Sequence, residues 1–138
     1  MVFIGEISLH TRGSGDILDI TGKVQDIVVS SRLTDGTATV FVTGSTAGIT
    51  TIEYEPGLVD DLQKLWERLV PKNIPYGHDA RWGDGNGYAH VRASLLGASL
   101  TVPFSKKKLL LGQWQQIILV DFDNRPRSGN IVVQMVGE

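Results

Sequence analysis

The sequence predicts an α+β fold in one compact domain, residues 1–138, with mixed or antiparallel sheets and two to three helices. Short alternating or β-branched segments dominate the first and last thirds of the chain, and helical periodicity occurs at only three places. A length of 138 residues with 41% hydrophobic content suits a single domain with its own core. Because the strands follow one another in runs, a doubly wound parallel sheet is not expected.

The first third of the chain contains three predicted strands and one predicted helix. Val2 to Thr11 alternates as a strand, and Asp16 to Ile20 forms a short second strand after the turn at Gly13–Gly15. Thr21 is the predicted cap of a helix that places four residues on one face: Val24, Ile27, Val28 and Ser31. Thr37 to Val42, rich in threonine and valine, is predicted to be a buried strand.

The middle third contains one predicted strand and two predicted helices. Ile49 to Tyr54 is a strand that ends before Pro56. Leu58 to Leu69 is the most regular helix pattern, with one apolar stripe: Leu58, Leu62, Leu65, Trp66 and Leu69. A loop rich in glycine follows. Ala89 to Leu96 then predicts a short helix closed by Gly97.

The last third is predicted to be all β. Four segments have strand character, and a polar turn at residues 124–129 separates the last two: Ser99–Phe104, Leu109–Leu111, Gln115–Phe122 and Asn130–Val136.

Charge and composition exclude several classes of function. Thirteen basic and fifteen acidic residues give a net charge of −2, so no general attraction to nucleic acid or to an anionic membrane is expected. Cysteine is absent, which excludes disulfides, thiolate nucleophiles and cysteine-ligated metal sites. No signal-peptide pattern and no apolar run of membrane-spanning length occurs, so we expect a cytoplasmic protein without membrane contact.

The segment from Tyr76 to His90 concentrates residues that bind ligands and transfer protons. His78, Asp84 and His90 lie within thirteen residues, separated by several glycines. Imidazole and carboxylate groups are common ligands of divalent metals, and glycine lets the backbone approach a bound group. The sequence therefore predicts a functional site here. The plainer alternative is that the glycines form a tight turn and the histidines only cap or pack.

Known glycine-rich signatures do not fit this segment. A dinucleotide fingerprint requires a sixth-position glycine where Tyr88 stands. A calcium loop that began at Asp84 would require glutamate where Leu95 stands.

Candidates outside the segment are weaker. Glu53 ends a strand that is otherwise apolar, and an inward-facing carboxylate there would need a cation or a donor. Trp114 beside Gln115 is suited to stacking on a planar heterocycle and bonding to its edge, but a core tryptophan is equally plausible. Arg127 and the lysines at 106–108 are typical of exposed turns.

Several motifs in one order resemble the YjbQ-like family, whose members are known as secondary thiamine-phosphate synthase enzymes. The resemblance runs from about Ile7 to the end of the sequence and rests on the following segments: Gly44-Ser45-Thr46-Ala47, Glu53, Tyr76-x-His78-Asp79, Asp84-Gly85-Asn86-Gly87-x-Ala89-His90, Ala93-Ser94-Leu95-Leu96-Gly97, Leu111-Gly112-x-Trp114-Gln115 and Asp123-x-x-Pro126-Arg127.

The resemblance implies a homotrimer with a cleft near the subunit contacts. It also implies an enzyme that couples a pyrimidine diphosphate to a thiazole phosphate with loss of pyrophosphate, assisted by a divalent metal, magnesium or zinc. The implied catalytic residues are His78, Asp84, His90 and Glu53, with the metal held by His78, His90 and Asp84. The residues implied to bind the small phosphorylated heterocyclic substrate are Gly85, Asn86, Gly87, Trp114, Gln115 and Arg127.

One departure from the family pattern bears on the metal. Many members carry histidine where this chain has Gly44, so a three-histidine site does not transfer intact. Two other functions stay open on the residues alone. One is a metal-dependent phosphate or ester hydrolase, since two histidines and a carboxylate can activate a water beside a metal. The other is a non-catalytic trimer that binds a small anionic metabolite.

Overall fold

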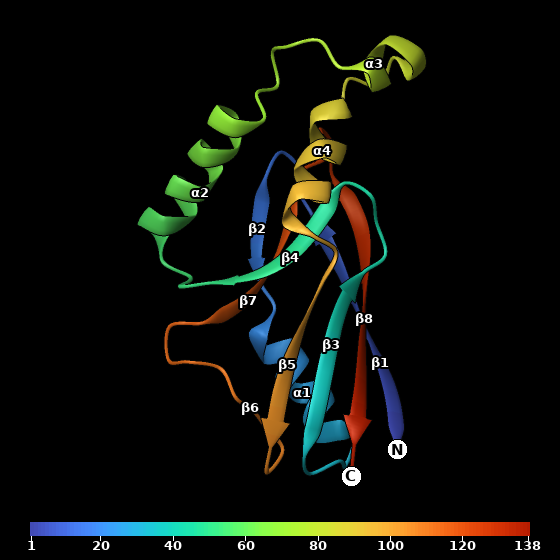
Figure 1. The fold of residues 1–138 in the computed structure, drawn as a ribbon, viewed down its shortest axis with the longest axis vertical. Coiled ribbons are helices and arrows are strands. Elements are labelled where there is room, and N and C mark those ends of the chain that lie inside the picture. The colour runs from blue at the N-terminus through green and yellow to red at the C-terminus, as the bar shows by residue number, and fades with distance from the viewer.

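Two antiparallel sheets and four helices make up the computed structural model, which describes residues 1–138 (Figure 1). The larger sheet has the strand order β1-β8-β3-β5-β6, and the smaller has the order β2-β7-β4. All neighbouring strands pair antiparallel, which confirms the predicted α+β class. The strands are β1 Val2–Thr11, β2 Asp16–Asp19, β3 Gly36–Val42, β4 Ala47–Ile52, β5 Ser99–Ser105, β6 Lys108–Leu109, β7 Gln116–Asp121 and β8 Arg127–Gly137.

Four helices are present where the sequence predicts two or three: α1 Thr21–Ser30, α2 Pro56–Leu69, α3 Gly77–Trp82 and α4 Gly87–Leu96. The additional helix, α3, forms inside the segment that we predict as a loop. It ends at Gly83, whose φ of 71° is a left-handed conformation that glycine adopts without strain. None of the four helices has the length and apolar character needed to cross a membrane.

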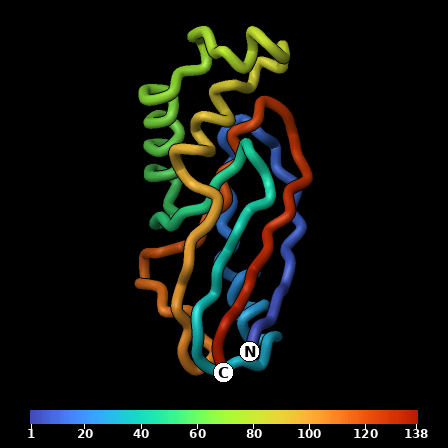
Figure 2. The backbone as a smooth tube through the Cα atoms, turned by 45° about the vertical axis from the view of Figure 1, so that its right-hand side comes forward, coloured from blue at the N-terminus to red at the C-terminus, as the bar shows by residue number.

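Strand β7 lies between the two cores of the molecule, and both of its faces are therefore buried. Ile117 and Leu119 face the larger sheet and contribute to the main core, whereas Ile118 and Val120 face α2 and α4. Figure 2 shows those two helices on one side of the molecule and the long strands of the larger sheet on the other. A strand buried on both faces carries a continuous apolar run instead of alternation.

Helix α1 uses the predicted face. Val24 and Val28 are fully buried, and Ser31, which follows the helix, is buried as well. The predicted capping role of Thr21 is wrong. Thr21 is the first helical residue, and its hydroxyl donates to Asp19 in β2 and accepts from the Ile117 amide in β7. The hydroxyl therefore connects α1 to these two strands and does not cap an amide of the helix.

Helix α2 begins at Pro56, two residues earlier than predicted. The carboxylate of Glu55 accepts hydrogen bonds from the Gly57 and Leu58 amides at 2.8 Å each, and proline suits the first helical position. Only Trp66 of the predicted stripe is buried, and its ring lies edge-on to that of Phe122 with the centroids 5.0 Å apart. The buried face of α2 does not reach the end of the stripe. Leu69, for example, is 58% exposed.

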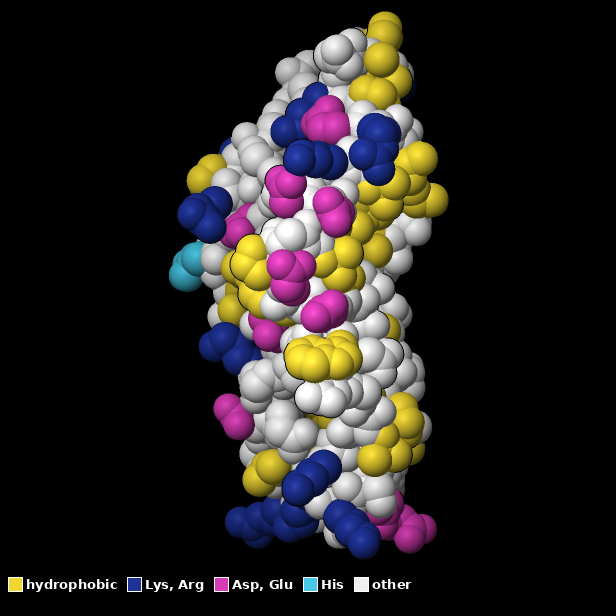
Figure 3. Space-filling view, turned by 90° about the vertical axis from the view of Figure 1, so that its left-hand side faces the viewer, with side chains coloured by type: hydrophobic (Ala, Val, Ile, Leu, Met, Phe, Trp, Pro, Cys, Tyr) yellow, Lys and Arg dark blue, Asp and Glu magenta, His cyan; other side chains and the backbone are white.

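Strands β5 and β6 form a hairpin whose turn contains no glycine. Lys106 and Lys107 both have positive φ, 51° and 65°, as a two-residue turn of the primed type requires. Figure 3 shows basic side chains gathered at this end of the molecule, which lies opposite α3.

Strand β8 begins at Arg127 and not at Asn130 as predicted. It pairs with β1 along the whole length of β1, from Val2↔Val136 to Thr11↔Arg127.

Candidate functional site

The end of β7 and the start of β8 frame a hollow of about 240 Å³. Asp121 closes β7 on the face that Ile117 and Leu119 use, so its carboxyl lies where the gap between the two sheets opens. We call this the Arg127 hollow. It is lined by Thr11, Val42, Thr43, Gly44, Ser45, Thr46, Ala47, Leu119, Asp121, Arg127, Ser128, Gly129 and Asn130.

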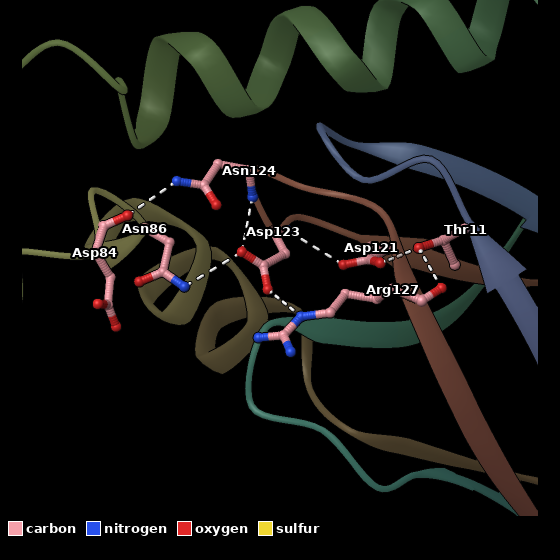
Figure 4. Close-up of polar contacts among 7 residues, drawn as sticks. All are labelled: Thr11, Asp84, Asn86, Asp121, Asp123, Asn124 and Arg127. Atoms are coloured by element: carbon pink, nitrogen blue, oxygen red, sulfur yellow. Dashed lines mark hydrogen bonds and ion pairs between the residues drawn. The ribbon is translucent and has the colours of Figure 1, made fainter.

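Asp123 is fully buried and holds Arg127 in place. Its carboxylate accepts hydrogen bonds from Arg127 Nε, from Asn86 Nδ2 at 3.2 Å and from the Asn124 amide at 2.8 Å (Figure 4). Burial alone would raise the pKa of Asp123, but the hydrogen bonds from Arg127 and Asn86 outweigh burial and hold the pKa below its usual value. Asp123 is therefore a carboxylate at neutral pH.

Arg127 keeps its two terminal nitrogens available for another partner. Only Nε is used on Asp123, and Figure 4 shows the terminal nitrogens directed away from that carboxylate. The side chain is 44% exposed. A planar guanidinium fixed through Nε presents a fork of N–H groups, the geometry that matches two oxygens of a phosphate or carboxylate.

Asp121 is a second buried carboxyl group in the same place. It accepts hydrogen bonds from the Thr11 hydroxyl and, at 3.1 Å, from the Asp123 amide. Burial raises the pKa of Asp121, against the opposing hydrogen bond from Thr11. Both oxygens of Asp121 therefore accept hydrogen bonds at the edge of the Arg127 hollow.

The two histidines of the predicted site lie side by side. The His78 and His90 ring centroids are 4.5 Å apart with the rings tilted by 41°. His78 Nδ1 is 3.4 Å from Asp79 Oδ1, and that oxygen also accepts from the Gly87 amide at 2.8 Å. Because His78 lies on α3 and His90 on α4, the pair depends on the unpredicted helix.

Asp84 does not join the histidines within one chain. Asp84 is exposed in the connection between α3 and α4, and its backbone carbonyl accepts a hydrogen bond from Asn124 Nδ2 at 3.0 Å. Figure 4 shows its carboxylate turned away from Asp123 and Arg127. No three histidine, aspartate or glutamate side chains come together in an arrangement that fits a metal ion. The predicted set of His78, His90 and Asp84 is thus not assembled in one chain.

The glycine-rich stretch before α4 allows close packing of helices. A Cβ on Gly87 would lie 2.8 Å from the Tyr76 Cβ and 3.1 Å from Asp79 Oδ1, so only glycine fits there. The Gly87 amide is engaged by Asp79, and Gly85 has a φ of 70°. Asn86 is 5% exposed and its Oδ1 has no hydrogen-bond partner, although its Nδ2 holds Asp123.

The remaining predicted residues lie elsewhere. Glu53 is exposed just past β4, at the opposite end of that strand from Ala47, which lines the Arg127 hollow. Six residues of strand separate the two ends by about 20 Å. Trp114 is 64% exposed in the loop before β7, and Gln115 uses its side chain to accept from the Gly112 amide. Within one chain, none of these lines the same hollow as Arg127 or His90.

A second, more open hollow of about 280 Å³ contains His90. We call it the His90 hollow; its lining is Gly44, Ser45, Ala47, His90, Ala93, Ser94, Gly97 and Ala98. It shares Gly44, Ser45 and Ala47 with the Arg127 hollow, so the β3–β4 connection forms a common wall.

Reasoning from the sequence missed the two carboxyls nearest to Arg127. Asp123 entered only as part of a motif, and Asp121 not at all. A signal was available, because Asp121 ends an apolar strand and shares parity with Asp123, and an acid on a buried face needs a partner. Thr11 and Ser128 had no such signal, since they reach the hollow only through the β1–β8 register.

We predict weak metal binding that depends on the histidine pair. Only two ligand side chains converge, so titration of purified protein with Zn²⁺ should show weak binding that is lost in His78→Ala and in His90→Ala. His10, on β1, is the matched control, and His10→Ala should bind as the wild type does. Tight binding of one ion per chain would contradict this expectation and would require a third ligand from another subunit.

Known proteins resemble this chain over its full length. The family described as UPF0047 protein YjbQ-like matches residues 5–138. The UPF0047 protein of Archaeoglobus fulgidus is 38% identical over 129 residues, covering 94% of this chain and 98% of that protein. That of Methanothermobacter thermautotrophicus is 36% identical over 137 residues, covering 99% and 94%.

Solved structures agree with these sequence relatives. A YbjQ-like protein of unknown function from Sulfolobus solfataricus P2 superposes with a TM-score of 0.95 at 33% identity, covering 100% of this chain and 99% of the other. An uncharacterized YjbQ/UPF0047 family protein from Clostridium acetobutylicum gives 0.87 at 34% identity, covering 96% and 99%. These names state no activity, so the synthase activity stays a prediction. The chain belongs to the YjbQ/UPF0047 family.

Proposed function

We propose that the chain is a transferase that joins a pyrimidine diphosphate to a thiazole phosphate with loss of pyrophosphate. The observation that carries the proposal is Arg127, fixed by the buried Asp123 and presenting a fork of donors to a hollow of about 240 Å³. A hollow of this size accommodates a phosphate group and part of the molecule attached to it.

The lining of the Arg127 hollow suits a phosphate. Arg127 supplies a positive charge and directed N–H donors. Five hydroxyl groups line the hollow, those of Thr11, Thr43, Ser45, Thr46 and Ser128. Thr11 and Thr43 donate to Asp121 and to the Asn130 carbonyl, and Ser128 is paired with His10, so Ser45 and Thr46 are the hydroxyl donors available to phosphate oxygens. The negative charge of Asp123 is neutralised by Arg127 and by hydrogen bonds, and the carboxyl of Asp121 is occupied by hydrogen bonds from the Thr11 hydroxyl and the Asp123 amide.

The proposed reaction breaks one C–O bond and forms one C–N bond. The bond between the pyrimidine methylene carbon and its diphosphate oxygen breaks, and the oxygen leaves with the electron pair as pyrophosphate. The thiazole nitrogen donates its lone pair to that carbon and becomes a positively charged thiazolium. Charge therefore grows on the leaving oxygen in the transition state, where Arg127 and the hydroxyl groups of Ser45 and Thr46 stabilise it.

A divalent metal belongs to the expectation from the resemblance, but the residues of one chain do not form a closed site for it. His90, which lies beside His78, lines the second hollow and offers an imidazole there as a hydrogen-bonding group for a substrate.

The proposal includes a homotrimer. Exposed apolar side chains share the outer face of the larger sheet, as the pairing register shows: Val2, Ile4, Phe41 and Val136. An apolar patch on the outer face of a sheet is suited to contact with another copy of the chain. Light scattering should give about three times the 15.0 kDa of one chain, and a monomeric mass would contradict the trimer.

The reaction is tested by measuring pyrophosphate release and thiazolium formation with purified protein. We expect pyrophosphate to appear only when the pyrimidine diphosphate and the thiazole phosphate are both present. Phosphate or pyrophosphate released without the thiazole would identify a hydrolase instead. Thermal stabilisation by either substrate without turnover would identify a binding protein, and either result would end the transferase proposal.

A further inference from the structure

The Arg127 hollow and the His90 hollow meet along the β3–β4 connection. Gly44, Ser45 and Ala47 line both of them, and each hollow alone measures under 300 Å³. This short segment is thus the wall that the two hollows have in common. Whether a ligand reaches both hollows depends on how far the side chains of the segment project into the space between them.

Gly44 leaves that space open. A Cβ built at Gly44 would meet no heavy atom within 4 Å, so the position faces empty space and is not filled by a neighbouring side chain. Gly48, on β4, is the opposite case, because a Cβ there would lie 2.8 Å from the Gly97 carbonyl. Gly48 is thus required by packing, whereas the fold itself does not require a glycine at 44.

The two hollows differ in chemistry. The Arg127 hollow combines a guanidinium with hydroxyl groups, which suits a phosphate. The His90 hollow is lined by small residues, among them Ala93, Gly97 and Ala98, and its polar side chains are the imidazole and the hydroxyl groups of Ser45 and Ser94. A flat ring lies well on small side chains, and an imidazole nitrogen is able to hydrogen-bond to an atom at the ring edge.

We propose that Gly44 is a specificity-determining residue that lets one ligand extend from Arg127 to His90. The ligand class is a planar heterocycle that carries a phosphate on a short flexible arm, with the phosphate on Arg127 and the ring beside His90. The inference rests on the assignment of phosphate to the Arg127 hollow in the proposed function. It does not depend on turnover.

The test compares two probes on wild-type protein and on Gly44→His, which places a side chain in the open space. The probes are inorganic phosphate and a thiazole with a phosphate on a two-carbon arm, titrated by calorimetry. We expect phosphate to bind both proteins equally, whereas the thiazole phosphate binds the variant at least about tenfold more weakly. Gly22→His in α1, where a Cβ also meets nothing within 4 Å, is the matched control and should leave both affinities unchanged.

Other results overturn the proposal. Equal loss of both probes would mean that Gly44 shapes the phosphate site, and no loss of either would mean that the ring does not pass Gly44. Equal wild-type affinity for the two probes would mean that the ring makes no contact. If Gly44→His unfolds, Gly44→Ala and Gly44→Ser serve in the same comparison. The inference stands if the thiazole phosphate behaves as expected but no coupling occurs, which separates its failure from that of the transferase.

Discussion

Replacing Arg127 with alanine is expected to lower kcat/KM for coupling by roughly 100- to 1000-fold. The variant removes the directed charge at the Arg127 hollow and leaves Asp123, which is fully buried, without its ionic partner. A charge-assisted pair of donors to a phosphate in a partly enclosed site accounts for about 3 to 4 kcal/mol of transition-state stabilisation. Steady-state kinetics with both substrates measures the loss.

Two further variants separate charge, geometry and folding. Arg127→Lys keeps the positive charge but loses the planar fork, so we expect it to lie between wild type and alanine. Arg125→Ala removes an exposed arginine two residues away that does not line the hollow, and it should retain wild-type kinetics. Thermal unfolding of each protein establishes that the assay temperature lies below its transition. Equal activity of Arg127→Ala and Arg125→Ala would refute the phosphate-binding role.

Replacing Arg92 with methionine is expected to cost about 3 kcal/mol of folding stability. Arg92 is 3% exposed, and its Nε and one terminal nitrogen donate to the Val70 carbonyl at 3.0 and 2.8 Å. The guanidinium also lies over the Tyr88 ring at 4.9 Å and pairs with Glu67 at 3.0 Å. Methionine fills the space but leaves the carbonyl unpaired, for about 1 to 3 kcal/mol, and loses the stacking, for about 1 kcal/mol.

The measurement is thermal or denaturant unfolding of the two proteins, with an expected drop in melting temperature of about 10 °C. Arg81→Met is a matched control, since Arg81 also lies over an aromatic ring, that of Trp82 at 5.4 Å, but both residues are exposed. We expect a change within about 0.5 kcal/mol for the control. Similar effects of the two substitutions would show that the contacts of Arg92 with Val70 and Glu67 contribute little to folding stability.

The strands were predictable because their patterns are local. Val2–Thr11 was predicted with its observed boundaries, and alternation or β-branching located the other strands to within a few residues. α1 and α4 were equally accessible, since Val24 and Val28 repeat at helical spacing and Gly97 marks an end. The Glu55 cap of α2 was missed because it lies in front of Pro56-Gly57, a pair that also signals a turn.

Helix α3 was not predictable from periodicity. It has six residues, contains no buried side chain, and is held by contacts to α4, among them Asp79 with the Gly87 amide. Short helices of this kind depend on tertiary contacts more than on intrinsic propensity. Without α3 the position of His78 beside His90 could only be guessed.

The residues that line the Arg127 hollow could not be grouped from the sequence alone. Thr11, Ser45, Asp121 and Arg127 come from four separate segments, and only the register of β1 with β8 and the face of β7 bring them together. Family resemblance pointed to Arg127 and to the Gly44–Ala47 segment. It gave no indication that Asp123 fixes the guanidinium while Asp121 lines the same space.

The order of strands in the larger sheet has a consequence for folding during synthesis on the ribosome. β1 is made early, but its only sheet neighbour is β8, more than a hundred residues later. A nascent chain therefore carries an unpaired, largely apolar β1 until β8 emerges and inserts between β1 and β3. Because Arg127 opens β8, the anion-binding fork is completed by the same insertion that shields β1 from aggregation.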